Sequence, residues 1–96
     1  MESFDVTIIG AGVVGCAVAR EASRLSLKIA VLEKELDVAC GNSSRNTGML
    51  HAGFTYAPGS LKAACAVEGN QEFDQVAQEL DVPFKRIGSL VVAFSD

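Results

Sequence analysis

Residues 6–15 read VTIIGAGVVG, and this stretch decides the fold. Its first four residues are mostly apolar and β-branched, which is typical of a short strand buried in a parallel sheet. Gly10, Gly12 and Gly15 then fit the spacing GxGxxG. This spacing indicates a dinucleotide site only where it joins a strand to a helix, so the flanking sequence has to supply both elements.

The flanking sequence predicts both elements. Residues 13–25 are expected to form a helix, because apolar side chains recur at helical spacing among arginines and a glutamate. Residues 28–32 (KIAVL) predict a second buried strand, which ends at Glu33. A strand, a helix and a strand within about 30 residues have the size of a right-handed βαβ unit. We therefore expect an α/β protein, a Rossmann-like FAD/NAD(P)-binding domain with a parallel sheet.

Each residue of this fingerprint has a physical task. Gly10 allows the tight turn, Gly12 leaves room for a pyrophosphate to approach the backbone, and Gly15 lets the helix pack closely on the strand. The helix N-terminus offers N–H groups to the phosphates. Glu33 can accept hydrogen bonds from an adenosine ribose and would repel a 2′-phosphate, which disfavours NADP. FAD and NAD remain open, as does a glycine-rich turn that binds no nucleotide.

The rest of the chain divides into a long loop, a helix and a strand. Residues 35–59 are rich in Gly, Ser, Asn and Thr, and loops of this length are usually functional. Residues 60–80 are expected to form a long helix that Ser60 caps. A last strand is predicted for the apolar run at residues 89–94 (SLVVAF).

Composition places limits on the class of protein. The chain has 96 residues, of which 49% are apolar and 21% are charged, and its formal net charge is −4. This is the composition of one ordinary globular domain, and it excludes disorder. No apolar run approaches the roughly 18–20 residues of a membrane span, and the acidic balance argues against a nucleic-acid surface.

Cysteine and histidine usage indicates a reducing compartment and no metal site. Cys16, Cys40 and Cys65 are an odd number with wide spacing, and the first residues are acidic where a secretory signal would be basic. We expect free thiols in a cytoplasmic protein, with Cys16 and Cys65 in the core and Cys40 as a small buried residue. One histidine and scattered cysteines have no metal-ligand spacing.

Longer stretches of the sequence resemble a known family. Residues 5–35 and residues 43–53 (SSRNTGMLHAG) resemble the N-terminus of FAD-dependent oxidoreductases of the D-amino-acid-oxidase-like superfamily. Residues 58–63 (PGSLKA), 67–70 (VEGN) and 82–90 (VPFKRIGSL) are similar to the branch that holds flavin-type bacterial glycerol-3-phosphate dehydrogenases and L-2-hydroxyglutarate dehydrogenases. The resemblance covers essentially the whole chain.

The resemblance implies FAD as the cofactor, with its adenosine and pyrophosphate on the βαβ unit. It also implies that the loop at residues 43–48 runs along the pyrophosphate, ribityl chain and flavin, and that His51 lies beside the isoalloxazine as the candidate catalytic residue. A structural role for His51, a solvated charge for Arg45 and a flavin-proximal thiol for Cys40 remain open. The predicted cofactor-binding residues are Gly10, Gly12, Val13, Val14, Gly15, Glu33, Lys34, Ser43, Ser44, Arg45, Asn46, Thr47 and Gly48.

The resemblance further implies an activity. It points to oxidation of a small anionic hydroxy compound by hydride transfer to flavin, with glycerol 3-phosphate first and L-2-hydroxyglutarate or an amino acid as alternatives. A module that holds a nucleotide without catalysis is the alternative from another class. Family members carry a separate substrate domain, so residues 1–96 are expected to be a truncated N-terminal FAD-binding domain, inactive on its own. An electron-accepting partner and a peripheral attachment to a membrane also remain open.

Overall fold

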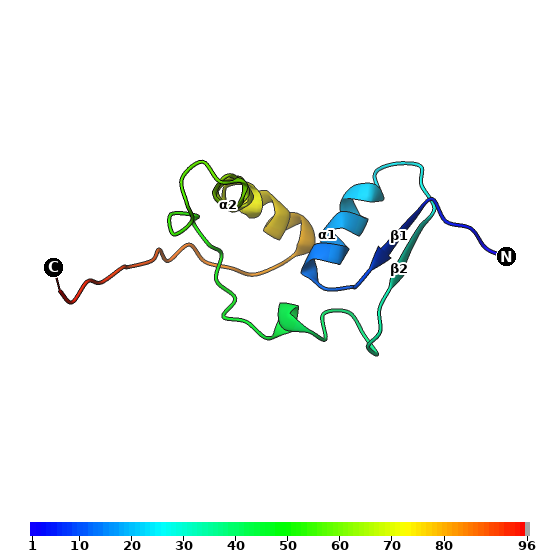
Figure 1. Cartoon of the computed structure of the whole chain (residues 1–96), viewed down its shortest axis with the longest axis horizontal. Helices are drawn as coiled ribbons and strands as arrows, with labels where there is room; N and C mark the ends of the chain where they lie inside the picture. Colours follow the sequence, from blue (N-terminus) through cyan, green and yellow to red (C-terminus); the bar gives the residue numbers. More distant parts are fainter. Residues whose placement is uncertain (96) are drawn as a thin grey trace. The chain divides into compact units, whose positions relative to one another are not determined.

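The computed structural model describes residues 1–95 (Figure 1). In chain order the elements are strand β1 (Val6–Ile9), helix α1 (Val13–Ala22), strand β2 (Ile29–Leu32), the 3₁₀ helix η1 (Asn42–Ser44) and helix α2 (Leu61–Leu80). The chain divides into two compact units, Met1–Met49 and a second unit that starts at Leu50, and each is described by itself. The predicted α/β architecture is confirmed.

β1 and β2 form a two-stranded parallel sheet, as the sequence predicts. Val6 lies opposite Ile29, and the pairing ends at Leu32. The N–H of Gly10 donates to the Leu32 carbonyl at 2.7 Å, so the hydrogen bonding continues one residue into the glycine turn. α1 contacts both strands and completes the βαβ unit, which Figure 1 shows beside the N-terminus.

The close approach of α1 to β1 depends on Gly15. A Cβ at this position would overlap the Gly10 carbonyl oxygen and would lie 3.5 Å from Ile8 Cγ2. Gly10 itself has φ +104°, a backbone conformation that residues with a side chain rarely adopt. The turn and the close packing that the sequence predicts therefore both require glycine.

α1 ends at Ala22, earlier than the apolar spacing over residues 13–25 predicts. The Ser23 hydroxyl donates to the Arg20 carbonyl at 2.7 Å. The N–H of Leu25 donates only three residues back, to the Ala22 carbonyl at 3.0 Å. Because the serine side chain offers the backbone an alternative partner, the chain leaves the helix in tight turns.

α2 matches the helix predicted for residues 60–80. Ser60 Oγ accepts a hydrogen bond from the N–H of Ala63 at 3.1 Å, which is the geometry of an N-cap. At the other end, Asp81 adopts the left-handed conformation with φ +54°. Such a residue commonly terminates a helix.

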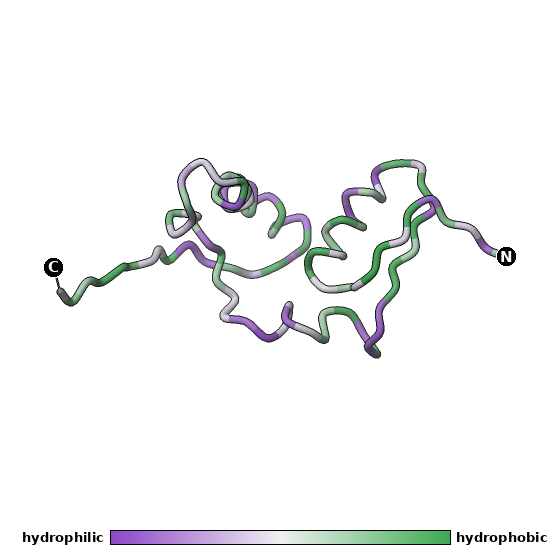
Figure 2. The backbone as a smooth tube through the Cα atoms, in the orientation of Figure 1, coloured by the Kyte–Doolittle hydropathy of each residue, from purple (hydrophilic) through white to green (hydrophobic). Residues whose placement is uncertain are grey.

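The strand predicted for residues 89–94 is wrong. Within residues 1–95 the only sheet is the β1–β2 pair, and the segment at 89–94 is paired with no strand. Figure 2 shows much of this segment as apolar, and Leu90 and Phe94 are 88% and 97% exposed. A strand forms only where a neighbouring strand accepts and donates its hydrogen bonds. An apolar β-branched run predicts a high strand propensity, but it does not predict whether a neighbouring strand is present.

Few side chains are buried. Ala11 in the first unit and Ala77 in the second are 2% and 3% exposed. On β1, Ile8 is half-buried on the side of α1, whereas the next residue, Ile9, is 87% exposed on the opposite face. One helix therefore covers one face of the sheet within this unit. No helix among residues 1–95 is long and apolar enough to cross a bilayer.

The predicted burial of the cysteines is also wrong. Cys16, Cys40 and Cys65 carry free thiols, and all three residues are exposed. The Cys16 thiol lies 3.6 Å from the Ala11 carbonyl, a weak hydrogen bond at the start of α1. Position on a helix does not by itself say which face a second element covers, and here the thiol faces are left uncovered.

Gly15→Ala is expected to destabilise the protein by about 1–3 kcal/mol, because its Cβ has no space beside the Gly10 carbonyl. The free energy of unfolding in urea measures this effect. Gly69→Ala in α2 is the matched control, since nothing lies within 4 Å of a Cβ there and the helix gains up to about 1 kcal/mol from alanine. Equal effects of the two substitutions would contradict the close approach of α1 to β1.

Candidate functional site

The glycine turn leads into the N-terminus of α1, where backbone N–H groups have no partner within the helix. Gly12 is the N-cap residue, extended at φ −78° and ψ −174°, and it has no side chain that could accept a hydrogen bond. The first turn of α1 contains no acidic residue. The first N–H groups of a helix also carry a partial positive charge. This end of α1 is therefore suited to an anion.

A serine from a distant loop caps this helix end. The N–H of Val13 donates to Ser43 Oγ at 2.8 Å, although the two residues are 30 positions apart. A Cβ at Gly12 would lie 3.0 Å from the same oxygen, so any side chain there would press on it. The hydroxyl oxygen takes the role that an oxygen of an anion could take at a helix start. The structure thus brings together Gly12, Val13 and Ser43, which the sequence predicts separately as cofactor-binding residues.

Glu33 lies on the other side of the glycine turn. Its Oε2 accepts a hydrogen bond from the N–H of Ala11 at 2.8 Å, and its Oε1 accepts one from Glu35 at 3.1 Å. The bond from Ala11, and then the bond from Glu35, hold the pKa of Glu33 below its ordinary value, so the carboxylate is ionised at neutral pH. A carboxylate has about four acceptor positions, which leaves about two for the hydroxyls of a ligand. Sequence reasoning found the acid but not its bond to the turn.

These groups line one cavity of about 450 Å³, within the range of about 300–1,000 Å³ typical of small-molecule sites. The N–H of Ala39 donates to the Ala11 carbonyl at 2.9 Å and fastens the following loop to the turn. The lining comes from the ends of both strands, the turn and the loop into η1: Ile9, Gly10, Gly12, Leu32, Glu33, Lys34, Glu35, Ala39, Cys40, Gly41, Asn42 and Ser43. Cys40 therefore lines this cavity with an exposed thiol and is not the small buried residue that the sequence predicts.

The remaining predicted loop residues do not line this cavity. Asn46 Nδ2 donates to the Asn42 and Ser43 carbonyls at 2.9 and 3.0 Å. The N–H of Gly48 donates to Asn46 Oδ1 at 2.8 Å, so the side-chain amide of Asn46 shapes the loop itself. The predicted residues that the structure leaves exposed and outside the lining are Val13, Val14, Ser44, Arg45, Asn46, Thr47 and Gly48.

His51 belongs to the second unit, and it is exposed. Its ring centroid lies 6.2 Å from that of Tyr56, and Lys62 Nζ lies 4.5 Å from the Tyr56 centroid. The backbone carbonyl of His51 accepts a hydrogen bond from Asn70 Nδ2 at 3.1 Å. The sequence identifies His51 by its motif but carries no signal for this contact with α2.

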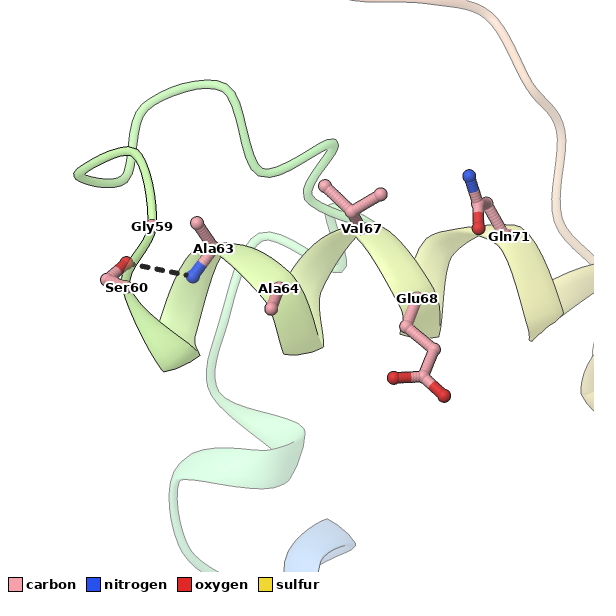
Figure 3. A pocket seen from close by; sticks show the side chains of 7 residues that line it. All are labelled: Gly59, Ser60, Ala63, Ala64, Val67, Glu68 and Gln71. Carbon is pink, nitrogen blue, oxygen red and sulfur yellow. Dashed lines mark hydrogen bonds between the residues drawn. The ribbon is translucent and has the colours of Figure 1, made fainter.

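A second cavity, of about 370 Å³, lies along the first half of α2 (Figure 3). Figure 3 shows the Ser60 cap at one end of it and the Glu68 carboxylate farther along the helix. The lining residues are Gly59, Ser60, Ala63, Ala64, Val67, Glu68 and Gln71. Since its one charged lining residue is an acid, this cavity does not suit a pyrophosphate.

Comparison with known proteins identifies the class to which this fold and site belong. The family described as FAD dependent oxidoreductase (DAO) matches residues 5–96, and the chain belongs to this family. The family is FAD dependent and its domain is a Rossmann-like FAD-binding fold, which confirms the predicted fold class and cofactor.

Among individual proteins, the chain is similar to a glycerol 3-phosphate dehydrogenase of Caloramator mitchellensis, with 52% identity over 93 residues that cover 97% of this chain and 19% of that protein. It is 42% identical over 95 residues to a mitochondrial L-2-hydroxyglutarate dehydrogenase of Caenorhabditis elegans, which covers 97% of this chain and 22% of that protein. The human mitochondrial L-2-hydroxyglutarate dehydrogenase is 42% identical over 93 residues, 95% of this chain and 20% of that protein. The chain spans about a fifth of the length of these curated relatives.

Glu33 is expected to give up its hydrogen bond from Ala11 only at a pH below the ordinary glutamate pKa of about 4.3. Because the pKa is lowered in the folded state, the contribution of Glu33 to stability is complete above the unfolded-state pKa and is lost as the pH falls through the folded-state pKa. The chemical shift of the Ala11 amide proton in an acid titration reports this step. Glu33→Gln should abolish the step and Glu35→Gln should retain it; a midpoint above the ordinary value would contradict the assignment.

Proposed function

We propose that residues 1–96 form the N-terminal FAD-binding part of an oxidoreductase whose substrate domain lies in other sequence. The observation that carries this proposal is the juxtaposition of the α1 N-terminus, the Ser43 hydroxyl and the Glu33 carboxylate around one cavity. Positive helix N–H groups fit a pyrophosphate, and a carboxylate with acceptor positions to spare fits ribose hydroxyls. Membership of an FAD-dependent family supports FAD over NAD.

The fit to FAD assigns a role to each part of the site. Gly10, Gly12 and Gly15 keep the turn open and the helix close, and Glu33 takes the ribose. Val13, Val14 and Lys34 would hold the adenosine and pyrophosphate. The loop at residues 43–48 follows the cofactor toward the flavin; its predicted contacts are Ser43, Ser44, Arg45, Asn46, Thr47 and Gly48.

The proposed reaction is dehydrogenation of a small anionic hydroxy compound. Bound FAD supplies the two-electron acceptor for the hydride that leaves the substrate carbon. In this proposal His51 would accept the hydroxyl proton on an imidazole nitrogen, a role for which its exposed side chain is available. The chain itself contributes binding, orientation and this proton acceptor.

Glycerol 3-phosphate is the first proposed substrate, because the relative with 52% identity is a glycerol 3-phosphate dehydrogenase. L-2-hydroxyglutarate is the second, on the strength of relatives with 42% identity, and an amino acid is the third. An electron-accepting partner belongs to the same proposal. We also propose a cytoplasmic location for this protein. The names of the two animal relatives, in contrast, describe those proteins as mitochondrial.

Gly12→Val is expected to abolish FAD binding while the βαβ unit stays folded. The valine side chain would displace Ser43 Oγ, which lies 3.0 Å from the Cβ position, and would fill the space at the helix start. Fluorescence titration with FAD measures the affinity, and circular dichroism checks the fold. Gly69→Val is the matched control, since no atom lies within 4 Å of its Cβ position. Unchanged FAD affinity in the Gly12 variant would overturn the phosphate-site assignment.

The activity is tested by mixing the FAD-loaded enzyme that carries this segment with each candidate substrate without oxygen. Glycerol 3-phosphate is expected to bleach the flavin absorbance fastest. His51→Ala should slow this bleaching by roughly 10²–10⁴-fold, the usual contribution of a proton acceptor, with a smaller effect on FAD affinity. Bleaching by L-2-hydroxyglutarate alone would change the substrate assignment. Bound FAD that no candidate reduces would favour a nucleotide-holding module.

A further inference from the structure

Arg86 binds two residues of α2 at once. Its Nε donates to both carboxylate oxygens of Asp74 at 3.2 Å, and its Nη2 donates to Asp74 Oδ2 at 2.7 Å. The same guanidinium reaches Asn70, with Nη1 at 2.8 Å from Oδ1 and Nη2 at 2.7 Å from the backbone carbonyl. All three guanidinium nitrogens therefore donate, and their planar fork fixes the direction of each bond.

Asn70 passes this constraint to the segment that contains His51. Its Oδ1 accepts from Arg86, and its Nδ2 donates to the His51 carbonyl at 3.1 Å. Asn70 and Asp74 are four residues apart and lie on one face of α2, so one guanidinium can bind both. The result is a continuous tether, Arg86 to Asn70 to the His51 backbone.

A second contact holds the same segment on α2. Gly53 is buried with φ +94°, and a Cβ there would lie 3.0 Å from Val67 Cγ2. The segment from His51 to Gly53 is therefore fixed to α2 at two points, by the Asn70 hydrogen bond and by close packing. Two fixed points define both the position and the direction of a short backbone segment.

Arg86 and its partner Asp74 both stay ionised at neutral pH. The hydrogen bond from Arg86 lowers the pKa of Asp74, and the bond to Asp74 raises the pKa of Arg86. The Arg86 guanidinium carbon also lies 5.6 Å from the Phe84 ring centroid, and Phe84 packs edge-on against Phe73 of α2 at 5.0 Å. The arginine is thus oriented by an ion pair on one side and by an aromatic ring on the other.

Stability alone does not account for so specific an arrangement. The Arg86 and Asp74 side chains are 43% and 64% exposed, and exposed ion pairs contribute little to stability. The three residues of the tether come from three of the motifs quoted for the family resemblance, residues 43–53, 67–70 and 82–90. We propose that Arg86 is a positioning residue for His51 and acts through Asn70. This inference rests on the proposed place of His51 beside the flavin.

The sharpest test changes only the last link. Asn70→Asp keeps the shape of the side chain and strengthens its attraction to Arg86, but it replaces the Nδ2 donor by an oxygen that repels the His51 carbonyl. Gln75→Glu is the matched control: it makes the same amide-to-acid change on α2 and removes a bond to Glu79, outside the tether. Arg86→Lys is the second variant, because a lysine keeps a cation for Asp74 but lacks the arm that reaches Asn70.

Two readouts are taken on the FAD-loaded enzyme. The first is hydrogen–deuterium exchange of the amides at residues 51–56, with the amides of α2 as internal reference. The second is the absorbance spectrum of the flavin together with the pH profile of flavin reduction. In the Asn70 and Arg86 variants we expect exchange at 51–56 to rise about five- to tenfold, the scale of one hydrogen bond, with α2 unchanged. The flavin band and the pH profile should shift with it. Gln75→Glu should alter neither readout.

The outcomes separate this inference from the function on which it rests. Unchanged exchange at residues 51–56 in both variants would overturn the tether, whatever the flavin does. Faster exchange with an unaltered spectrum and pH profile would establish the tether but overturn its role at the flavin, and would count against the proposed place of His51. A shift in both readouts, absent from the Gln75 control, supports the inference.

Discussion

The contact between Gly15 and the Gly10 carbonyl is the constraint on which the first unit depends. Because nothing but hydrogen occupies that space, α1 starts immediately beyond β1 and runs back along the sheet. The turn that precedes α1 is bonded to Glu33, the residue after β2, through the N–H of Ala11. A side chain at Gly15 would push the start of α1 away from the turn, and the cavity beside the turn would lose its present shape.

The second unit combines polar contacts to α2 with the packing of Gly53 on Val67 and of Phe84 on Phe73. Arg86 and Asn70 hold two irregular segments against α2, and among the described residues Ala77 is the one residue of that helix that is buried. Directional bonds fix orientation better than apolar contacts do, while contributing less free energy per area. Under the proposed function, such an arrangement suits the segment at residues 51–53, which would present the His51 side chain in one direction.

Local chemistry explains which features the sequence could predict. The GxGxxG turn and the Ser60 cap act within a few residues of their own position, and the structure has both of them. The strand at residues 89–94 and the burial of the cysteines depend on what lies opposite, which spacing does not encode. At the site, the sequence named Val13, Ser43 and Glu33 but not the bonds that they make, since Val13 bonds to Ser43 across 30 residues and Glu33 bonds to Ala11 across 22.

The Ser43 cap has a consequence for the speed at which this site can work. The Ser43 hydroxyl accepts the hydrogen bond of the Val13 N–H and so docks the loop on the helix start. A serine can withdraw from that position by turning about one bond, a step between staggered rotamers that takes place in nanoseconds or less when the side chain is not locked by packing. Under the proposed function, a phosphate oxygen would take the place of the hydroxyl on the Val13 N–H after this fast rotation, and no movement of the loop backbone would be required.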